Sequence, residues 1–125
     1  MRRKKMTFDT VREIGRTLPG VEEGTVYGSP ALKVGGRMFT CMAVHRSAEP
    51  NTLAVRIDFD QRAALIAEDP QTYYLTDHYV DYPAVLVRLS RVTRDALRDL
   101  LHGAWRFESA KGPARRRRSR RTSQL

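Results

Sequence analysis

The densest run of chemically capable side chains lies near the end of the chain. Six arginines occupy the seven positions from 115 to 121, interrupted by Ser119. A guanidinium group keeps its charge at any working pH and binds phosphate oxygens in a bidentate manner. The pattern predicts sequence-nonspecific contacts with nucleic-acid phosphates, and a solubilising tail or attraction to other polyanions, such as lipid headgroups or acidic proteins, is the alternative. The candidate residues are Arg115, Arg116, Arg117, Arg118, Arg120 and Arg121.

A second basic feature surrounds the dipeptide Gly35-Gly36. Two consecutive glycines suit the positive φ angles of a two-residue hairpin turn, and Lys33 and Arg37 flank them. A hairpin with a basic tip can form a wing that enters a groove of DNA and contacts phosphates. Lys33 and Arg37 are therefore candidate nucleic-acid contacts, with an ordinary solvated hairpin as the alternative.

Catalytic and metal-binding arrangements are not indicated. Cys41 and His45 stand four residues apart on an expected strand. At ~3.3 Å per residue they are about 13 Å apart, too far for a thiolate–imidazole pair, so Cys41 is expected to be a small buried hydrophobic residue. The three histidines lack the close spacing of a metal motif, and a structural hydrogen bond explains the neighbouring Asp77 and His78 better than acid–base catalysis. The sequence therefore predicts no enzyme, no metal site and no cofactor.

Tyrosines gather between residues 73 and 82. Aromatic faces stack on bases or line a pocket for a small ligand, while core packing and cover for a sheet edge explain the same residues without a ligand. Together with a histidine of this segment and the single tryptophan, two of these tyrosines define a candidate ligand pocket. Its residues are His78, Tyr79, Tyr82 and Trp105.

The 125 residues carry a formal net charge of +9, unevenly placed. Of the 23 Lys and Arg, four lie in residues 2–5 and seven in residues 111–121, which leaves 12 against all 14 Asp and Glu between residues 6 and 110. This division predicts a basic extension over residues 1–5, one globular domain over residues 6–110 and a disordered Arg-rich tail over residues 111–125. One cysteine excludes an internal disulfide, and no apolar stretch approaches the ~20 residues of a membrane span. We therefore expect a cytoplasmic monomer with no membrane association.

Three helices are expected from capping residues and from the helical spacing of apolar residues. Thr7, Asp58 and Thr93 are the expected N-caps. The second helix is expected to direct three side chains inward, and the third carries a continuous apolar stripe. The inward side chains of the second helix are Phe59, Leu65 and Ile66.

The remaining apolar segments predict an antiparallel sheet. Strands are expected at residues 25–27, 31–34, 38–44, 52–57 and 84–89, and a strand with an irregular loop at residues 73–82. The resulting order is α-β-β-β-β-α-(β)-β-α. Because consecutive strands have short links, the fold class is α+β, an antiparallel sheet backed by helices.

Three strings of residues carry a family resemblance. They are LPGVEEGTVYGSPALKVGGRMF from Leu18, TDHYVDYPAVLVRL from Thr76 and LRDLLHGAWR from Leu97. In their order and spacing the chain resembles the MmcQ/YjbR family of small bacterial proteins. The resemblance implies a CyaY-like fold and DNA binding through a double-wing arrangement of hairpins, and it brings no catalytic residues.

The leading functional expectation is a non-catalytic DNA-binding protein whose basic tail contacts phosphates without sequence preference. The alternative is a module that binds a protein or a small ligand and whose tail is only attracted to polyanions. The −2 balance of the expected domain gives the folded part no general attraction to nucleic acid.

Overall fold

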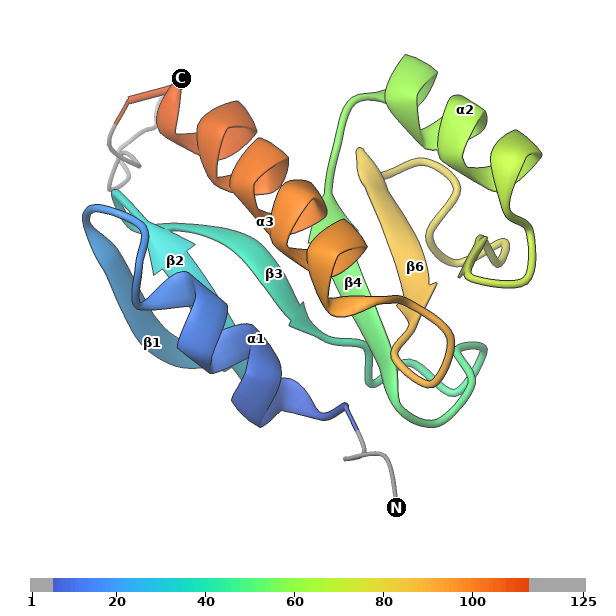
Figure 1. The fold of residues 1–125 in the computed structure, drawn as a ribbon, viewed down its shortest axis with the longest axis horizontal. Helices are drawn as coiled ribbons and strands as arrows, with labels where there is room; N and C mark the ends of the chain where they lie inside the picture. The colour runs from blue at the N-terminus through green and yellow to red at the C-terminus, as the bar shows by residue number, and fades with distance from the viewer. Residues whose placement is uncertain (1–5, 113–125) are drawn as a thin grey trace, which may run out of the picture.

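The computed structural model describes residues 6–112, which form one antiparallel sheet and three helices (Figure 1). The strands lie in the order β1-β2-β3-β4-β6-β5. The α+β class and the element order predicted from the sequence are confirmed. The elements in chain order are α1 (Phe8–Gly15), β1 (Val21–Val26), β2 (Ser29–Val34), β3 (Arg37–Met42), β4 (Thr52–Arg56), α2 (Phe59–Glu68), β5 (Tyr73–Tyr74), β6 (Ala84–Arg88) and α3 (Arg94–Ser109).

The predicted cap residues begin all three helices. The side chain of Thr7 accepts a hydrogen bond from the backbone N–H of Asp9, and Thr93 accepts one from that of Ala96. Asp58 accepts from the backbone N–H of Gln61 at 2.7 Å. These bonds satisfy backbone donors that have no partner within the first turn of a helix.

A tight turn joins β2 to β3, and a β-bulge shifts the register between these two strands. Gly35 and Gly36, with φ of 59° and 79°, join β2 to β3 as the glycine pair predicted. Between β2 and β3 the pairing shifts, so that Leu32 lies opposite Thr40 but Lys33 lies opposite Met38. Phe39 is the extra residue of this β-bulge, and it reverses the side-chain alternation of β3 at this point.

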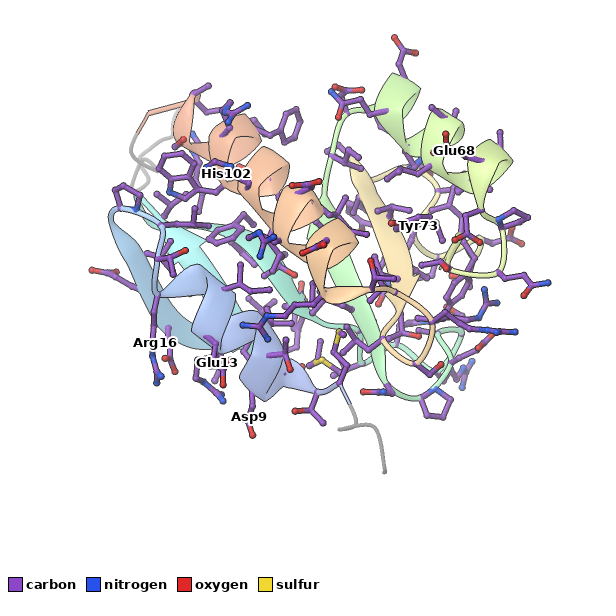
Figure 2. All side chains as sticks on the ribbon, viewed as in Figure 1. Asp9, Glu13, Arg16, Glu68, Tyr73 and His102 are labelled. Carbon is purple, nitrogen blue, oxygen red and sulfur yellow. The ribbon has the colours of Figure 1, made fainter. Side chains whose placement is uncertain are left out.

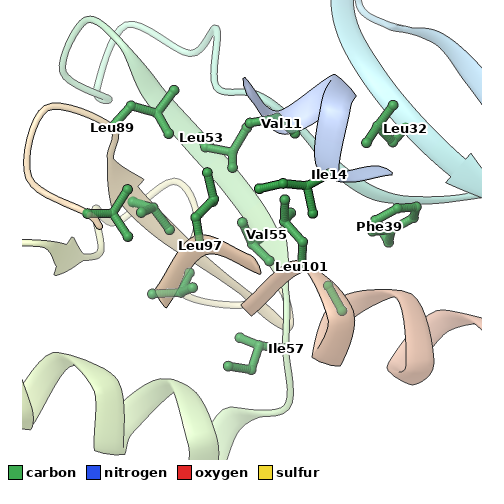
Figure 3. Packing of buried hydrophobic residues seen from close by; sticks show 14 of the residues in the cluster. Val11, Ile14, Leu32, Phe39, Leu53, Val55, Ile57, Leu89, Leu97 and Leu101 are labelled. Atoms are coloured by element: carbon green, nitrogen blue, oxygen red, sulfur yellow. The ribbon is translucent and has the colours of Figure 1, made fainter. Parts of the chain in front are cut away.

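All three helices lie on one face of the sheet, in front of it in Figure 1. Figure 3 shows Val11 and Ile14 of α1 meeting Leu97 and Leu101 of α3 above the strands. Phe39 and the large side chains of β4 and β6 complete this core from below. The charged residues Asp9 and Glu13 of α1 and the C-cap Arg16 point outward (Figure 2), so the helix buries only its apolar stripe.

The opposite face of the sheet, here called the open face, carries none of the helices of residues 6–112. Its central side chains are short: Ala31, Cys41 and Ala54 lie on adjacent strands in register, with Leu86 beside them. Loops cover part of this surface, with Ala48 and Tyr79 packed against it. Small residues on the strands and loops in place of helices leave room for a cavity.

One expectation for α2 is wrong. Phe59 faces solvent with 48% of its surface exposed, and the residue of α2 that is buried is Arg62. Helix α2 lies at the margin of the sheet, against β5 and β6, so its first turn extends beyond the core. Residues 73–82 form a short strand, Tyr73–Tyr74, followed by an irregular loop, as expected. Within residues 6–112, no helix is both long and apolar enough to cross a bilayer.

Candidate functional site

A hollow of about 470 Å³ opens on the open face. It lies over β3, β4 and β6 and between the β1–β2 turn, the segment after β3 and the loop before β6. Its volume lies in the range of ~300–1,000 Å³ that is typical of small-molecule sites. These strands and connecting segments come from well-separated parts of the sequence, so the hollow exists only in the folded domain.

Short side chains and the bulge of β3 form the floor of the hollow. Ala54 of β4 and Ala84 of β6 lie in it, where larger residues would fill the space. Met38 lies beside them because the bulge at Phe39 turns its side chain to the same face as Cys41. Apart from Arg56 at the end of β4, the floor is therefore apolar.

The rim of the hollow exposes large apolar side chains. Tyr27 is 92% exposed, Val44 57% and Tyr82 51%. These are three of the five large hydrophobic residues that are exposed in the described part of the chain, and a fourth, Val80, belongs to the same loop as Tyr82. Single exposed apolar residues are ordinary, but a group of them around a cavity is typical of a binding surface.

Tyr27 occupies an unfavourable backbone position. It joins β1 to β2 with Gly28, and the two residues have φ of 54° and 77°. A two-residue hairpin turn with both φ values positive favours Asn-Gly or Gly-Gly, and a bulky aromatic residue is rarely found there. An exposed tyrosine in this conformation contributes little to the stability of the turn.

Two histidines stack at one side of the hollow. The ring centroids of His45 and His78 are 3.5 Å apart with an interplanar angle of 8°, and Tyr79 meets His78 edge-on at 4.9 Å. Ser47 Oγ lies 2.8 Å from both His45 Nδ1 and Thr76 Oγ1, which ties the two loops together. Burial and the neighbouring His78 lower the pKa of His45, and burial raises the pKa of the Tyr79 hydroxyl.

Arg62 holds the loop that carries Tyr82. Its Nη1 donates to the carbonyl oxygen of Tyr82 at 2.8 Å and to that of Ala84 at 3.4 Å. The guanidinium also lies 4.7 Å from the centre of the Phe59 ring, which explains why Phe59 remains at the surface of α2. A buried cation of α2 thus positions one wall of the hollow.

Arg56 brings a permanent charge to the hollow. It follows Val55 on β4, and its side chain lies on the open face. Its Nε is buried and 4.0 Å from Glu108 Oε2, beyond hydrogen-bond distance. Burial raises the pKa of the nearby Cys41 thiol, and Arg56 acts in the opposite direction.

The structure separates the residues of the predicted ligand pocket. His78, Tyr79 and Tyr82 line the hollow together. Trp105 does not: it lies on α3, where its Nε1 donates to the carbonyl oxygen of Pro19 at 2.9 Å and His102 stacks beside it. Cys41 is buried, as expected, but β3 ends at Met42, so His45 belongs to a loop and not to the strand.

Of the two cations of the predicted basic hairpin, Arg37 makes a hydrogen bond within the fold. Arg37 Nε donates to the carbonyl oxygen of Gly112 at 3.0 Å and so fastens the end of α3 to β3. Lys33 lies opposite Glu22 of β1, and its side chain runs against Gly24. The six arginines from Arg115 to Arg121 and the basic residues of positions 2–5 lie outside the described residues.

Sequence reasoning missed Tyr27, His45 and Arg56 as parts of one site. A weak signal for Arg56 existed: in β4 the large residues Leu53 and Val55 alternate with Ala54 and Arg56, which marks one face of the strand as small and polar. Tyr27 was signalled by its place before Gly28, where a turn favours other residues. No local pattern indicates that these positions meet.

The described residues offer no group of three or more His, Cys, Asp and Glu that could hold a metal ion. The stacked pair of histidines has no third ligand of this kind beside it within residues 6–112. The hollow instead combines apolar walls, aromatic edges and one guanidinium. Concave surfaces of this composition are typical of small-molecule sites.

Comparisons with known proteins are consistent with this architecture. A family model, YjbR, matches residues 16–107 of the chain. Uncharacterized proteins of Mycobacterium tuberculosis and Mycobacterium bovis are 40% identical over 60 residues, which are 47% of this chain and 46% of each relative, so the match spans about half the length of these curated relatives. The crystal structure of Deinococcus radiodurans protein DR2400, with a DUF419 domain, is similar at a TM-score of 0.72 and 23% identity, over 92% of this chain and 87% of that one. The last likeness establishes a shared fold.

Proposed function

The chain belongs to the YjbR family, and we propose that its folded domain is a non-catalytic binding module that takes a small apolar ligand into the hollow of the open face. One observation carries the proposal: large exposed apolar residues gather around a cavity whose floor is apolar except for Arg56. Covering this rim with a ligand removes apolar surface from water, at about 25 cal/mol per Å². The rest of the described surface has no comparable group of exposed hydrophobic residues.

The contacts of the folded domain favour this function over DNA binding by the hairpin. Arg37 is engaged with Gly112, and many of the other cations of residues 6–112 are in ion pairs. Cations that already have a carboxylate partner gain less from a phosphate. The cations in ion pairs are Arg12, Arg16, Arg88, Arg94, Arg98 and Lys111, and Arg56 forms a longer pair with Glu108 at 4.0 Å.

A titration with 2-naphthalenemethanol, a neutral aromatic probe, tests the proposal. We expect shifts of backbone amide signals to concentrate at residues 26–28, 42–46 and 78–84, and Tyr82→Ser to weaken binding about 5- to 10-fold, because the rim loses an aromatic wall. Val80→Ser is the matched control, since Val80 is exposed on the same loop and does not line the hollow. Absence of binding, or binding that Tyr82→Ser leaves unchanged, contradicts the proposal.

Nucleic-acid binding by the tail is a second candidate function. The six arginines between positions 115 and 121 support it. If about five of them contact phosphates, the logarithm of the binding constant falls with the logarithm of salt concentration at a slope of about −4 to −5. This function would place the ligand-binding domain beside DNA or RNA.

A comparison of the full chain with a variant lacking residues 113–125 tests the tail. We expect truncation to remove most of the affinity for a DNA duplex at low salt and most of the salt dependence. A full chain with Lys33→Ala and Arg37→Ala tests the hairpin in the same assay. If truncation leaves the affinity and the slope unchanged, the tail is not the binding element.

A further inference from the structure

The charges that line the hollow are of one sign. Arg56 is its permanently charged residue, and the imidazole rings of His45 and His78 also line it. Among the described residues no Asp or Glu lines the hollow. A neutral ligand would leave this arrangement without a partner.

Arg56 is incompletely paired within the domain. The carboxylate nearest to it belongs to Glu108, whose Oε2 already accepts a hydrogen bond from Lys111 Nζ at 3.0 Å and lies 4.0 Å from Arg56 Nε. Glu108 is buried and serves two cations, so the group of three carries a net positive charge. The Nε atom of Arg56 has no hydrogen-bond partner within residues 6–112. A buried donor that lacks a partner is costly, and a carboxylate at the guanidinium adds the negative charge that Glu108 supplies only in part.

Building on the proposed function, we propose that the ligand is a small aromatic carboxylic acid, bound as its anion. The carboxylate meets the guanidinium of Arg56 at the floor, and the aromatic body lies between Met38 and the tyrosines Tyr27 and Tyr82. A planar guanidinium matches a carboxylate in a bidentate pair. With Glu108 balancing part of the positive charge, the site suits a single negative charge better than the two of a phosphate monoester.

The position of the charge in the hollow also favours an amphipathic ligand. Arg56 lies on the strand, at the floor, while the most exposed apolar residues stand at the rim. The acid group therefore enters first and the apolar body remains under the rim. This arrangement of charge and apolar surface distinguishes the hollow from a uniformly hydrophobic surface that accepts any apolar molecule.

The test compares two probes of the same shape near neutral pH, 2-naphthoate and 2-naphthalenemethanol. For the unchanged protein we expect 2-naphthoate to bind about 10- to 100-fold more tightly, the range of a charge-assisted hydrogen bond over a neutral one. Arg56→Gln is expected to abolish this preference while the neutral probe still binds, and Arg56→Lys to retain part of it. Arg46→Gln is the control, because Arg46 is an exposed cation next to His45 that does not line the hollow.

Each outcome separates the two proposals. Equal affinities of the two probes for the unchanged protein contradict the carboxylate assignment and leave the proposed binding function in place. Failure of both probes to bind in the hollow contradicts both. If Arg46→Gln removes the preference for 2-naphthoate as fully as Arg56→Gln does, the preference arises from general electrostatic attraction. That result overturns the role of Arg56. Amide spectra of each variant establish that it is folded, and the probe comparison in the unchanged protein does not depend on any variant.

Discussion

The two faces of the sheet differ in how they use their apolar residues. On the helix-covered face, residues of β2, β3, β4 and β6 such as Leu32, Phe39 and Leu53 are almost completely buried under α1 and α3. On the open face the strands carry Ala31, Cys41 and Ala54, and the large apolar residues Tyr27 and Tyr82 stand around a cavity with much of their surface in water.

This difference indicates that the helix-covered face stabilises the fold, whereas the open face serves another purpose. On the helix-covered face, the large apolar side chains are buried and stabilise the fold, which explains why they are there. Stability does not explain the open face, where an aromatic residue stands at a turn position that disfavours it and a guanidinium lacks a full set of partners. Features that cost free energy are typical of functional sites.

The largest expected effect is a difference in stability between variants of two neighbouring residues of β3. The bulge places the side chains of these neighbours on opposite faces of the sheet. Phe39→Ala is expected to lower the free energy of unfolding by about 3–5 kcal/mol, because it leaves a void in a fully buried core. Met38→Ala, on the half-buried floor of the hollow, is expected to cost only about 1 kcal/mol. Urea denaturation of both variants measures the difference. Equal losses would mean that the open face is a second core.

Arg62 links the two faces, and its removal is expected to have an intermediate effect. Arg62→Met removes the charged donor to the carbonyl oxygens of Tyr82 and Ala84, leaves that of Tyr82 with only the backbone N–H of Ala84, and is expected to cost about 1–2 kcal/mol. Faster hydrogen exchange should be confined to residues 79–84, and binding of the aromatic probe should weaken. Arg91→Met, at an exposed position, is the control. A uniform increase in exchange over the whole domain would contradict a local role.

Tyr27 is expected to give opposite signs for stability and binding. Tyr27→Asn places a residue that tolerates positive φ in the turn and is expected to raise the free energy of unfolding by about 0.5–1 kcal/mol. The same change removes an aromatic wall and is expected to weaken probe binding. Tyr27→Phe separates the ring from the hydroxyl and should leave stability unchanged. A loss of stability in Tyr27→Asn would mean that the tyrosine serves the fold.

The smallest expected effect is a pH dependence at the end of the open face away from the hollow. Arg88 donates to both carboxylate oxygens of Glu49 at 2.9 and 2.7 Å, lies over the ring of Tyr74, and holds the pKa of Glu49 below its usual value near 4.5. The folded state therefore binds this proton less readily than the unfolded chain. The pair stabilises the fold above about pH 4.5, and this contribution is lost as the pH falls through the lowered pKa.

Glu49→Gln tests this dependence. Thermal unfolding of the variant should change less between pH 6 and pH 3 than that of the unchanged protein. Glu68→Gln, at an exposed position on α2, should keep the original dependence. Identical pH profiles for Glu49→Gln and the unchanged protein would show that the Arg88–Glu49 pair does not contribute to stability.

The sequence by itself determined the local structure and the family. Caps at Thr7, Asp58 and Thr93 and the glycine pair at 35–36 act over a few residues, so their signals survive without knowledge of the fold. The strings that carry the resemblance led to the family, and the family model and the shared fold agree with them. The charge division along the chain also follows from the sequence alone.

Tertiary structure decided which residues meet. Phe59 was predicted to face inward from its spacing, but the marginal position of α2 put it in water and buried Arg62. The bulge at Phe39 and the register between β3 and β4 decided that Met38 and Arg56 share a face with Ala54. Register and helix placement depend on the packing of segments far apart in sequence, so no local pattern could assemble Tyr27, His45 and Arg56 into one site.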